Sequence, residues 1–151
     1  MPQVGEKATD FILPSTEGSL QLSRVYKEKK VVLAFYTEDD TPSCAQELAS
    51  FKEEYTTIQE LGAEVVAVSV DSLGSHRSFR DKVGGYPFPL VSDEEREVAA
   101  AYHVLHDNGK RSHRAVFVID REGVVIHAIP WYQPGNPSQL LEVFQTLGLE
   151  V

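Results

Sequence analysis

Two apolar runs separated by an amphipathic stretch are the clearest pattern in the chain. Residues 31–36 and 65–70 are unalternated and too short for a helix, as expected of strands that are covered on both faces. Between them, apolar residues recur at spacings of three and four from Ala45 to Leu61, which predicts a helix that ends near Gly62. A strand, a helix and a second strand in this order predict a parallel, right-handed crossover.

The second half of the chain repeats this pattern and then departs from it. Short helices are expected at residues 75–83 and 94–103, on either side of a short strand at residues 89–91. The apolar runs 115–119 and 124–126 flank a polar segment with a glycine, which predicts an antiparallel hairpin. The sheet is therefore expected to mix parallel and antiparallel strands.

The two ends of the chain add one element each. Residues 140–147 carry an apolar stripe that predicts a final helix, and the runs 11–13 and 20–22 predict an N-terminal hairpin. The expected fold is α/β, with a mixed central β-sheet, helices on both faces and an N-terminal β-hairpin extension. Because no linker or repeat interrupts the pattern, we expect residues 1–151 to form a single domain.

The composition narrows the possible partners. The chain has 151 residues, 42% of them hydrophobic, and a net charge of −9. Scattered acidic charge disfavours polyanions, so neither nucleic acid nor an anionic membrane is an expected partner. No stretch resembles a signal peptide or reaches the ~18 apolar residues of a membrane span, and we expect a cytoplasmic protein. With one cysteine, Cys44, the chain can form neither an internal disulfide nor a multi-thiolate zinc site.

Cys44 follows a buried strand and a polar loop, at the start of a helix. The helix begins either at Pro42, with Thr41 as its N-cap, or after Ser43, with Gln46 completing a capping box. Both alternatives put Cys44 in the first turn, where free N–H groups and the positive end of the helix dipole favour a thiolate over a thiol. The position alone leaves two hypotheses open, a reactive thiol or an inert buried thiol.

The sequence around Cys44 resembles the active-site loop of the peroxiredoxins, Pro-x-x-x-Thr-x-x-Cys. Within that family, residues 39–47 are similar to the loop of the bacterioferritin comigratory protein group. Further matching segments follow in the same order along the chain: Val4-Gly5, Ala8-x-Asp10-Phe11, Ser69-Val70-Asp71-Ser72, Ser75-His76, Phe79, Phe88-Pro89-Leu90, Ser92-Asp93 and Arg114-x-x-Phe117-Val118-Ile119-Asp120-x-x-Gly123. The resemblance implies a thioredoxin-like fold and a thiol-dependent peroxidase that reduces hydrogen peroxide and organic hydroperoxides.

The resemblance also implies roles for individual residues. Cys44 would be the nucleophile that attacks the peroxide and becomes a sulfenic acid. Thr41 would orient the peroxide, because a hydroxyl can donate and accept at the same time. Arg114 would favour the thiolate and stabilise charge on the peroxide oxygens, although an arginine on a strand is more often a surface residue. Glu47 matches the family, but it could equally be a solvated acid in the first helical turn. The expected supporting residues are Thr37, Pro42, Ser43 and Glu47.

Two positions depart from the family pattern. Thr37 stands where the family has proline, which would fix φ and remove a backbone donor beside the thiolate, so pocket rigidity and shielding are expected to differ. Ala49 stands where many members of the comigratory group carry a resolving cysteine. The sulfenic acid on Cys44 would therefore be reduced by an external thiol, from a thioredoxin-like, glutaredoxin-like or small-thiol reductant, in a monomer or homodimer. Thr37 also favours a second hypothesis, a redox sensor or binding module on the same fold with little turnover.

Other residues give weaker signals. His103 and His106 have i, i+3 spacing, but no acidic or thiol ligand is grouped with them, so no metal or other cofactor is expected. Thr41 stands where the first cysteine of a Cys-x-x-Cys motif would be, which excludes a dithiol oxidoreductase. Trp131 and Tyr132 are expected to pack in the core before a turn, rather than to form a self-association patch.

Overall fold

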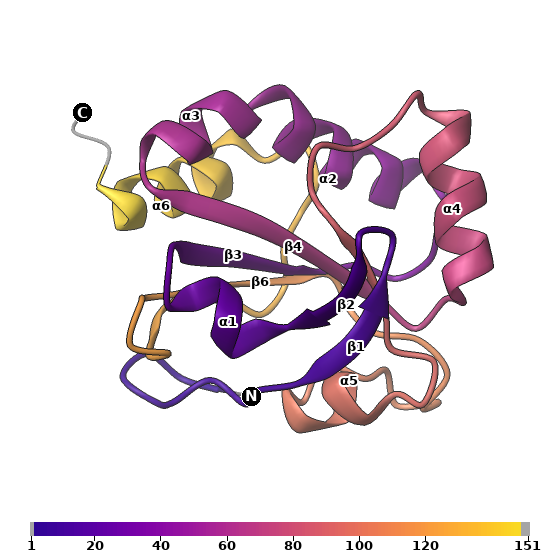
Figure 1. The fold of residues 1–151 in the computed structure, drawn as a ribbon, viewed down its shortest axis with the longest axis horizontal. Coiled ribbons are helices and arrows are strands. Elements are labelled where there is room, and N and C mark those ends of the chain that lie inside the picture. Colours follow the sequence, from indigo (N-terminus) through magenta and orange to yellow (C-terminus); the bar gives the residue numbers. More distant parts are fainter. Residues whose placement is uncertain (1, 149–151) are drawn as a thin grey trace.

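A seven-stranded sheet, in the order β2-β1-β5-β4-β3-β6-β7, runs through the molecule (Figure 1). The computed structural model describes residues 2–148. The strands are β1 (Ile12–Ser15), β2 (Gly18–Gln21), β3 (Lys30–Phe35), β4 (Ala63–Ser69), β5 (Leu90–Ser92), β6 (Ala115–Ile119) and β7 (Val125–Ile129). The helices are α1 (Leu22–Tyr26), α2 (Pro42–Glu53), α3 (Tyr55–Glu60), α4 (Leu73–Lys82), α5 (Glu97–Ala101) and α6 (Pro137–Leu147). Within residues 2–148, no helix is long and apolar enough to cross a membrane.

β3 lies in the interior of the sheet because it is apolar almost throughout. It pairs in parallel with β4, where Val32 faces Val65, and antiparallel with β6, where Val32 faces Val118. Every residue from Val31 to Phe35 is buried, so the strand is covered on both faces, as its unalternated run predicts. The parallel pairing of β3 with β4 is confirmed, and β6 and β7 form the predicted antiparallel hairpin.

Helices cover both faces of the sheet, and alternate residues of β3 point into two separate cores. Val32 and Ala34 pack with residues of α2, α3, α4 and α6 on one face. Val31 and Leu33 pack with residues of α1 and α5 on the other face. Figure 1 shows α2, α3 and α6 above the sheet and α1 and α5 below it. The predicted mixed sheet with helices on both faces is confirmed, and the N-terminal hairpin β1–β2 forms one edge.

One predicted helix is two helices in the structure. The stretch 45–61 divides into α2 and α3, because the backbone at Glu54 leaves the helical conformation (φ −95°, ψ 10°). After this break the Tyr55 hydroxyl reaches the Glu64 carboxylate on β4, at 2.9 Å. The apolar spacing continues across the break, and for this reason spacing alone predicts a single helix.

The predicted helix at residues 94–103 is also shorter than expected. α5 has only five residues, because Arg96 and His103 beside its two ends adopt left-handed backbone conformations (φ 61° and 55°). The Asp93 carboxylate accepts hydrogen bonds from backbone N–H groups at the start of α5 and so caps the shortened helix. The apolar pattern also did not predict α1, which follows the N-terminal hairpin directly.

Candidate active site

The candidate site begins at the N-terminus of α2, where Thr41 is the N-cap residue in an extended conformation (φ −88°, ψ 148°). The alternative helix start after Ser43 is wrong. Pro42 at the first helical position sacrifices no hydrogen bond, because the N–H there has no partner within the helix. The Thr41 side chain does not cap the helix, since its Oγ1 donates to the carbonyl oxygen of Glu38 at 3.1 Å. Its lone pairs accept no hydrogen bond from the described residues, so they can accept one from a ligand.

Cys44, in the first turn of α2, is completely buried. The backbone N–H of Thr37 donates to its Sγ at 3.3 Å. A proline at this position has no N–H and could not make this bond. The departure from the family pattern at Thr37 therefore adds a donor to the sulfur. This N–H and the free N–H groups of the helix start both place positive partial charge near the sulfur, which favours the thiolate.

Glu47, about one helical turn after Cys44, is completely buried, and neither of its carboxylate oxygens has a hydrogen-bond partner among the described residues. Burial raises the pKa of Glu47 well above its ordinary value, and the negative charge of Cys44 raises it further, against the opposing effect of Arg114. The surroundings of Glu47 therefore favour the protonated form of its carboxyl group. The alternative of a solvated acid in the first turn is wrong.

Arg114 lies directly before β6 and is half-buried. Its Nε is buried and has no hydrogen-bond partner in the part of the chain that the structure describes. A cavity of about 330 Å³ lies beside Arg114, and Thr37 lines the same cavity. Arg114 is therefore only partly a surface residue. The remaining lining residues are His106, His113, Trp131, Tyr132 and Gln133.

One wall of this cavity is formed by the rings of His106, His113 and Trp131, and it was not predicted from the sequence. An isolated β-bridge brings His106 and His113 together, and their ring centroids lie 3.9 Å apart. The His113 ring centroid lies 4.3 Å from that of Trp131. Trp131 is 62% exposed, so the expectation that it packs in the core is wrong, whereas Tyr132 is buried against Phe51 as expected. Spacing carries no signal for such a cluster, because its members meet only through tertiary contacts.

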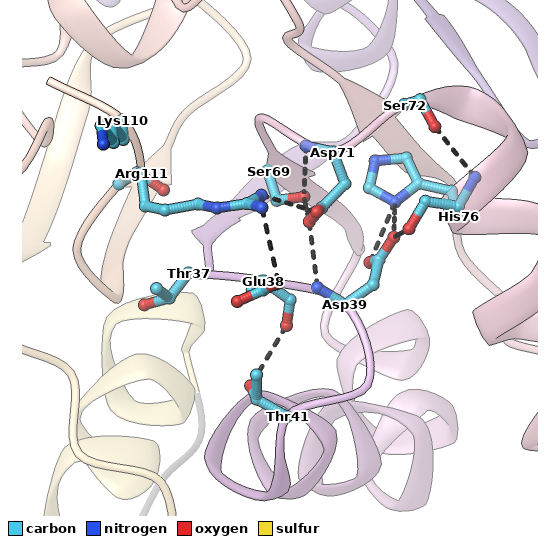
Figure 2. A network of polar contacts seen from close by, with 12 residues as sticks. Thr37, Glu38, Asp39, Thr41, Ser69, Asp71, Ser72, His76, Lys110 and Arg111 are labelled. Atoms are coloured by element: carbon cyan, nitrogen blue, oxygen red, sulfur yellow. Dashed lines mark hydrogen bonds and ion pairs between the residues drawn. The ribbon is translucent and has the colours of Figure 1, made fainter.

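A buried polar network holds the loop before α2 (Figure 2). His76 lies with its Nε2 2.9 Å from the carbonyl oxygen of Val91 and its Nδ1 2.8 Å from the Asp39 carboxylate. That carboxylate also accepts hydrogen bonds from the Tyr36 and Ser75 hydroxyls, at 2.6 and 2.7 Å. Burial alone would raise the pKa of Asp39, but the hydrogen bonds from His76 and Tyr36 outweigh it and lower the pKa. The ionised carboxylate therefore fixes the loop to α4.

Asp71, after β4, is the second anchor of this loop. Its carboxylate accepts hydrogen bonds from the backbone N–H of Asp39 at 2.9 Å and from Arg111 at 2.7 Å. Arg111 also lies 3.4 Å from the Glu38 carboxylate (Figure 2). Because the carbonyl of Glu38 accepts the hydrogen bond of the Thr41 hydroxyl, the network orients the hydroxyl at the start of α2.

The same network contains a group with the composition of a metal site. Asp39, Asp71 and His76 place ligand atoms within 4.8 Å of one another. All three side chains are buried and already bonded to protein groups. We therefore interpret the cluster as structural support for the loop, and the sequence resemblance had marked Asp71 and His76 without indicating this role.

Comparison with known proteins assigns the chain to a family. The AhpC/TSA family model matches residues 4–128. The chain belongs to the AhpC/TSA family. It is 38% identical over 129 residues to a putative peroxiredoxin bcp of Coxiella burnetii, covering 82% of this chain and 85% of that protein. It is 34% identical over 151 residues to peroxiredoxin Bcp of Bacillus subtilis, covering 96% of this chain and 94% of that protein.

Solved structures give the same result for the fold of this AhpC/TSA protein. The crystal structure of peroxidoxin BcpB from Mycobacterium tuberculosis superposes with a TM-score of 0.86 at 28% identity, covering 97% of each chain. The predicted resemblance to Bcp-type peroxiredoxins and the predicted thioredoxin-like fold are confirmed. The predicted activity, thiol-dependent reduction of peroxides, is likewise that of the AhpC/TSA family, with a hydroperoxide and a thiol as its two substrates.

Proposed function

We propose that Cys44 is the peroxidatic cysteine of this AhpC/TSA protein and that residues 1–151 act as one domain. The environment of the sulfur carries the proposal. The sulfur lies in the first turn of α2 and accepts a hydrogen bond from the N–H of Thr37, and Arg114 lies at the neighbouring cavity. Each of these groups favours an anion. Because the chain has one cysteine, no other thiol is present to perform the chemistry.

The first half-reaction oxidises the Cys44 sulfur by two electrons. The thiolate attacks the terminal oxygen of a hydroperoxide ROOH, so that an S–O bond forms while the O–O bond breaks. The attacked oxygen keeps its hydrogen and becomes the hydroxyl of the sulfenic acid. The other oxygen leaves as RO⁻ and takes up a proton to form ROH. Hydrogen peroxide reacts in the same way, with R as hydrogen, and gives water.

The residues around Cys44 position the peroxide for this attack. The Thr41 hydroxyl donates to Glu38 and can accept a hydrogen bond from the peroxide, which holds the terminal oxygen in line with the sulfur. Arg114 supplies donors to the oxygen that gains negative charge as the O–O bond breaks. The raised pKa of Glu47, one turn after Cys44 on α2, favours its protonated form, which carries no negative charge that would oppose the thiolate.

The remaining loop residues support this arrangement. Pro42 fixes φ at the first helical position, and Ser43 occupies the exposed second position, so neither competes with the sulfur for the donors of the helix start. Thr37 contributes its backbone N–H.

The second half-reaction needs a thiol from outside the chain. Ala49 stands exposed on α2 where a resolving cysteine would stand, so no internal disulfide can form. An external thiol condenses with the sulfenic acid, releasing water and forming a mixed disulfide. A second thiol then releases the Cys44 thiolate and leaves as the disulfide of the reductant. The reductant belongs to the thioredoxin-like, glutaredoxin-like or small-thiol classes, and the protein acts as a monomer or homodimer.

Intact-protein mass spectrometry with peptide mapping tests the proposal. One equivalent of hydrogen peroxide should add one oxygen to Cys44, or join two chains through it, and excess peroxide should produce the sulfinic and sulfonic acids. Excess dithiothreitol should prevent this overoxidation and give many turnovers, while Cys44→Ser should consume no peroxide. Oxygen on Met1 with a reduced Cys44 would show an inert buried thiol. Oxidised Cys44 without turnover would instead support the redox-sensor hypothesis, which the departure at Thr37 favours.

A further inference from the structure

The cavity beside Arg114 is much larger than hydrogen peroxide requires. Its volume is about 330 Å³, whereas a water molecule occupies about 30 Å³ of liquid and hydrogen peroxide has only one more oxygen atom. Thr37, which bonds to the Cys44 sulfur through its backbone, lines this cavity together with Arg114. A peroxide reacting at the sulfur would therefore have space on this side for a substituent of considerable size.

Three rings form one wall of the cavity, and the backbone holds them in place. The His113 ring lies between those of His106 and Trp131, with centroid distances of 3.9 and 4.3 Å. The backbone N–H of Tyr132 donates to the carbonyl oxygen of Arg114 at 2.9 Å, which ties the residue next to Trp131 to the residue next to His113. The wall therefore has a fixed position relative to Arg114.

Trp131 is exposed although the fold does not need its ring at the surface. The residue is 62% exposed, whereas the adjacent Tyr132 is buried, and its ring stacks on that of Phe51 at a centroid distance of 5.8 Å. Tyr132 thus supplies the core contact of this segment. An exposed tryptophan at the opening of a cavity is a surface on which a flat apolar group gains contact area.

The middle ring of the wall, that of His113, carries little charge at neutral pH. Burial lowers the pKa of His113, and the neighbouring His106 lowers it further, against the opposing effect of Asp107, so the His113 ring is neutral. Arg114, beside the reacting end, is the only residue among the lining groups with a permanent charge. The chemistry of the wall therefore fits an uncharged apolar group.

We propose that the wall of His106, His113 and Trp131 is a subsite for the organic substituent of the substrate, and that it selects uncharged hydroperoxides with an aromatic or bulky apolar group over hydrogen peroxide. This inference rests on the proposed role of Cys44. The hydroperoxide group points toward Cys44 between Thr37 and Arg114, and the substituent stacks on the rings.

Steady-state kinetics with three peroxides test the subsite. We would measure kcat/KM for cumene hydroperoxide, tert-butyl hydroperoxide and hydrogen peroxide, with dithiothreitol as reductant. The measured quantity is the ratio of the cumene value to the hydrogen peroxide value. Trp131→Ala should lower this ratio by about tenfold, because the stacking surface is lost. His113→Ala should lower it in the same direction, and Trp131→Phe should keep most of it, because a flat ring remains.

Ile12→Ala is the matched control, because Ile12 is 64% exposed on β1 and does not line the cavity. It should leave all three values unchanged. An unchanged ratio in Trp131→Ala would overturn the subsite while the proposed function stands. The subsite would also be overturned if Trp131→Ala converted a dimer into a monomer, which would show that the wall is an interface between two copies. A wild-type protein that turns over none of the peroxides would instead overturn the proposed function.

Discussion

Replacing Thr37 by proline should test whether its backbone donor favours the thiolate of Cys44. The substitution removes the N–H that lies 3.3 Å from Sγ. Tyr36, which precedes it, lies just after the end of β3 and donates a hydrogen bond from its own N–H to the carbonyl oxygen of Val68, a bond that a proline at position 37 does not remove. The change therefore deletes one donor without breaking the strand.

The magnitude follows from the cost of losing a hydrogen bond to a charged group, about 1.5–3 kcal/mol. An N–H···S contact of this length belongs at the lower end of this energy range. Its loss corresponds to a roughly tenfold lower thiolate population in Thr37→Pro than in the wild type, at every pH at which the thiol predominates. A thiolate with higher proton affinity is also the better nucleophile, with a logarithmic slope of about 0.4–0.5, so each thiolate reacts roughly threefold faster. The net rate should be about threefold lower in acid and about threefold higher in alkali.

The rate of alkylation by iodoacetamide, followed from about pH 5 to about pH 9, measures the reactivity of Cys44, because Cys44 is the only thiol that can react. The ratio of the Thr37→Pro rate to the wild-type rate should cross unity as the pH rises. A change in access to the sulfur would shift the ratio equally at every pH and would not produce the crossing. Thr37→Ala keeps the N–H and should give a ratio that is independent of pH. A flat ratio for Thr37→Pro, or a crossing for Thr37→Ala, would refute the reasoning.

Three further predictions concern other residues of the structure. Arg114→Met should slow peroxide oxidation of Cys44 by about 100-fold in rapid-mixing experiments, because a positioned donor is lost. Arg121→Met, a control at an exposed site, should leave the oxidation rate unchanged. Glu47→Gln should stabilise the protein increasingly as the pH rises above the ordinary pKa of glutamate, by up to about 1.4 kcal/mol per pH unit. The reason is that the raised pKa of buried Glu47 makes the folded wild-type protein bind a proton that the unfolded chain has released. Urea unfolding at several pH values measures the difference in unfolding free energy between the two proteins, and a difference that stayed constant with pH would contradict this prediction. Gly123→Ala should lower the unfolding free energy, measured by thermal unfolding, by about 1–3 kcal/mol more than Gly84→Ala does. Both glycines have positive φ (83° and 85°), but only an alanine at position 123 would place its Cβ 2.7 Å from the ring of Tyr26 on α1. Equal losses in the two variants would show that the Tyr26 ring moves away freely.

The parts of the fold that the sequence predicted are those in which burial imposes a regular spacing. The unalternated run of β3 and the apolar stripe of α6 are examples, since each residue's environment repeats with the backbone. The break at Glu54 could not be predicted in this way, because the stripe continues through it. The length of α5 depends on a left-handed Arg96, a conformation that side-chain patterning does not encode.

In the candidate site, too, local features were predictable from the sequence, and features that depend on tertiary contacts were not. The sequence left two helix starts open, but both put Cys44 in the first turn, so the position of Cys44 was predictable. Arg114 lies far from Cys44 in sequence, and only the family resemblance indicated it. The protonation of Glu47 depends on how completely other segments cover it, and the wall containing Trp131 depends on contacts between distant loops. Both are properties of the assembled tertiary structure.

Trp131 is the only tryptophan in the chain. All of the intrinsic tryptophan fluorescence of the protein therefore originates at the opening of the cavity beside Arg114. Emission from an indole ring responds to the polarity around it and to the charge of a neighbouring imidazole, here that of His113. A molecule entering or leaving the cavity should consequently change an optical signal that needs no attached label and that carries no tryptophan background from the rest of the fold.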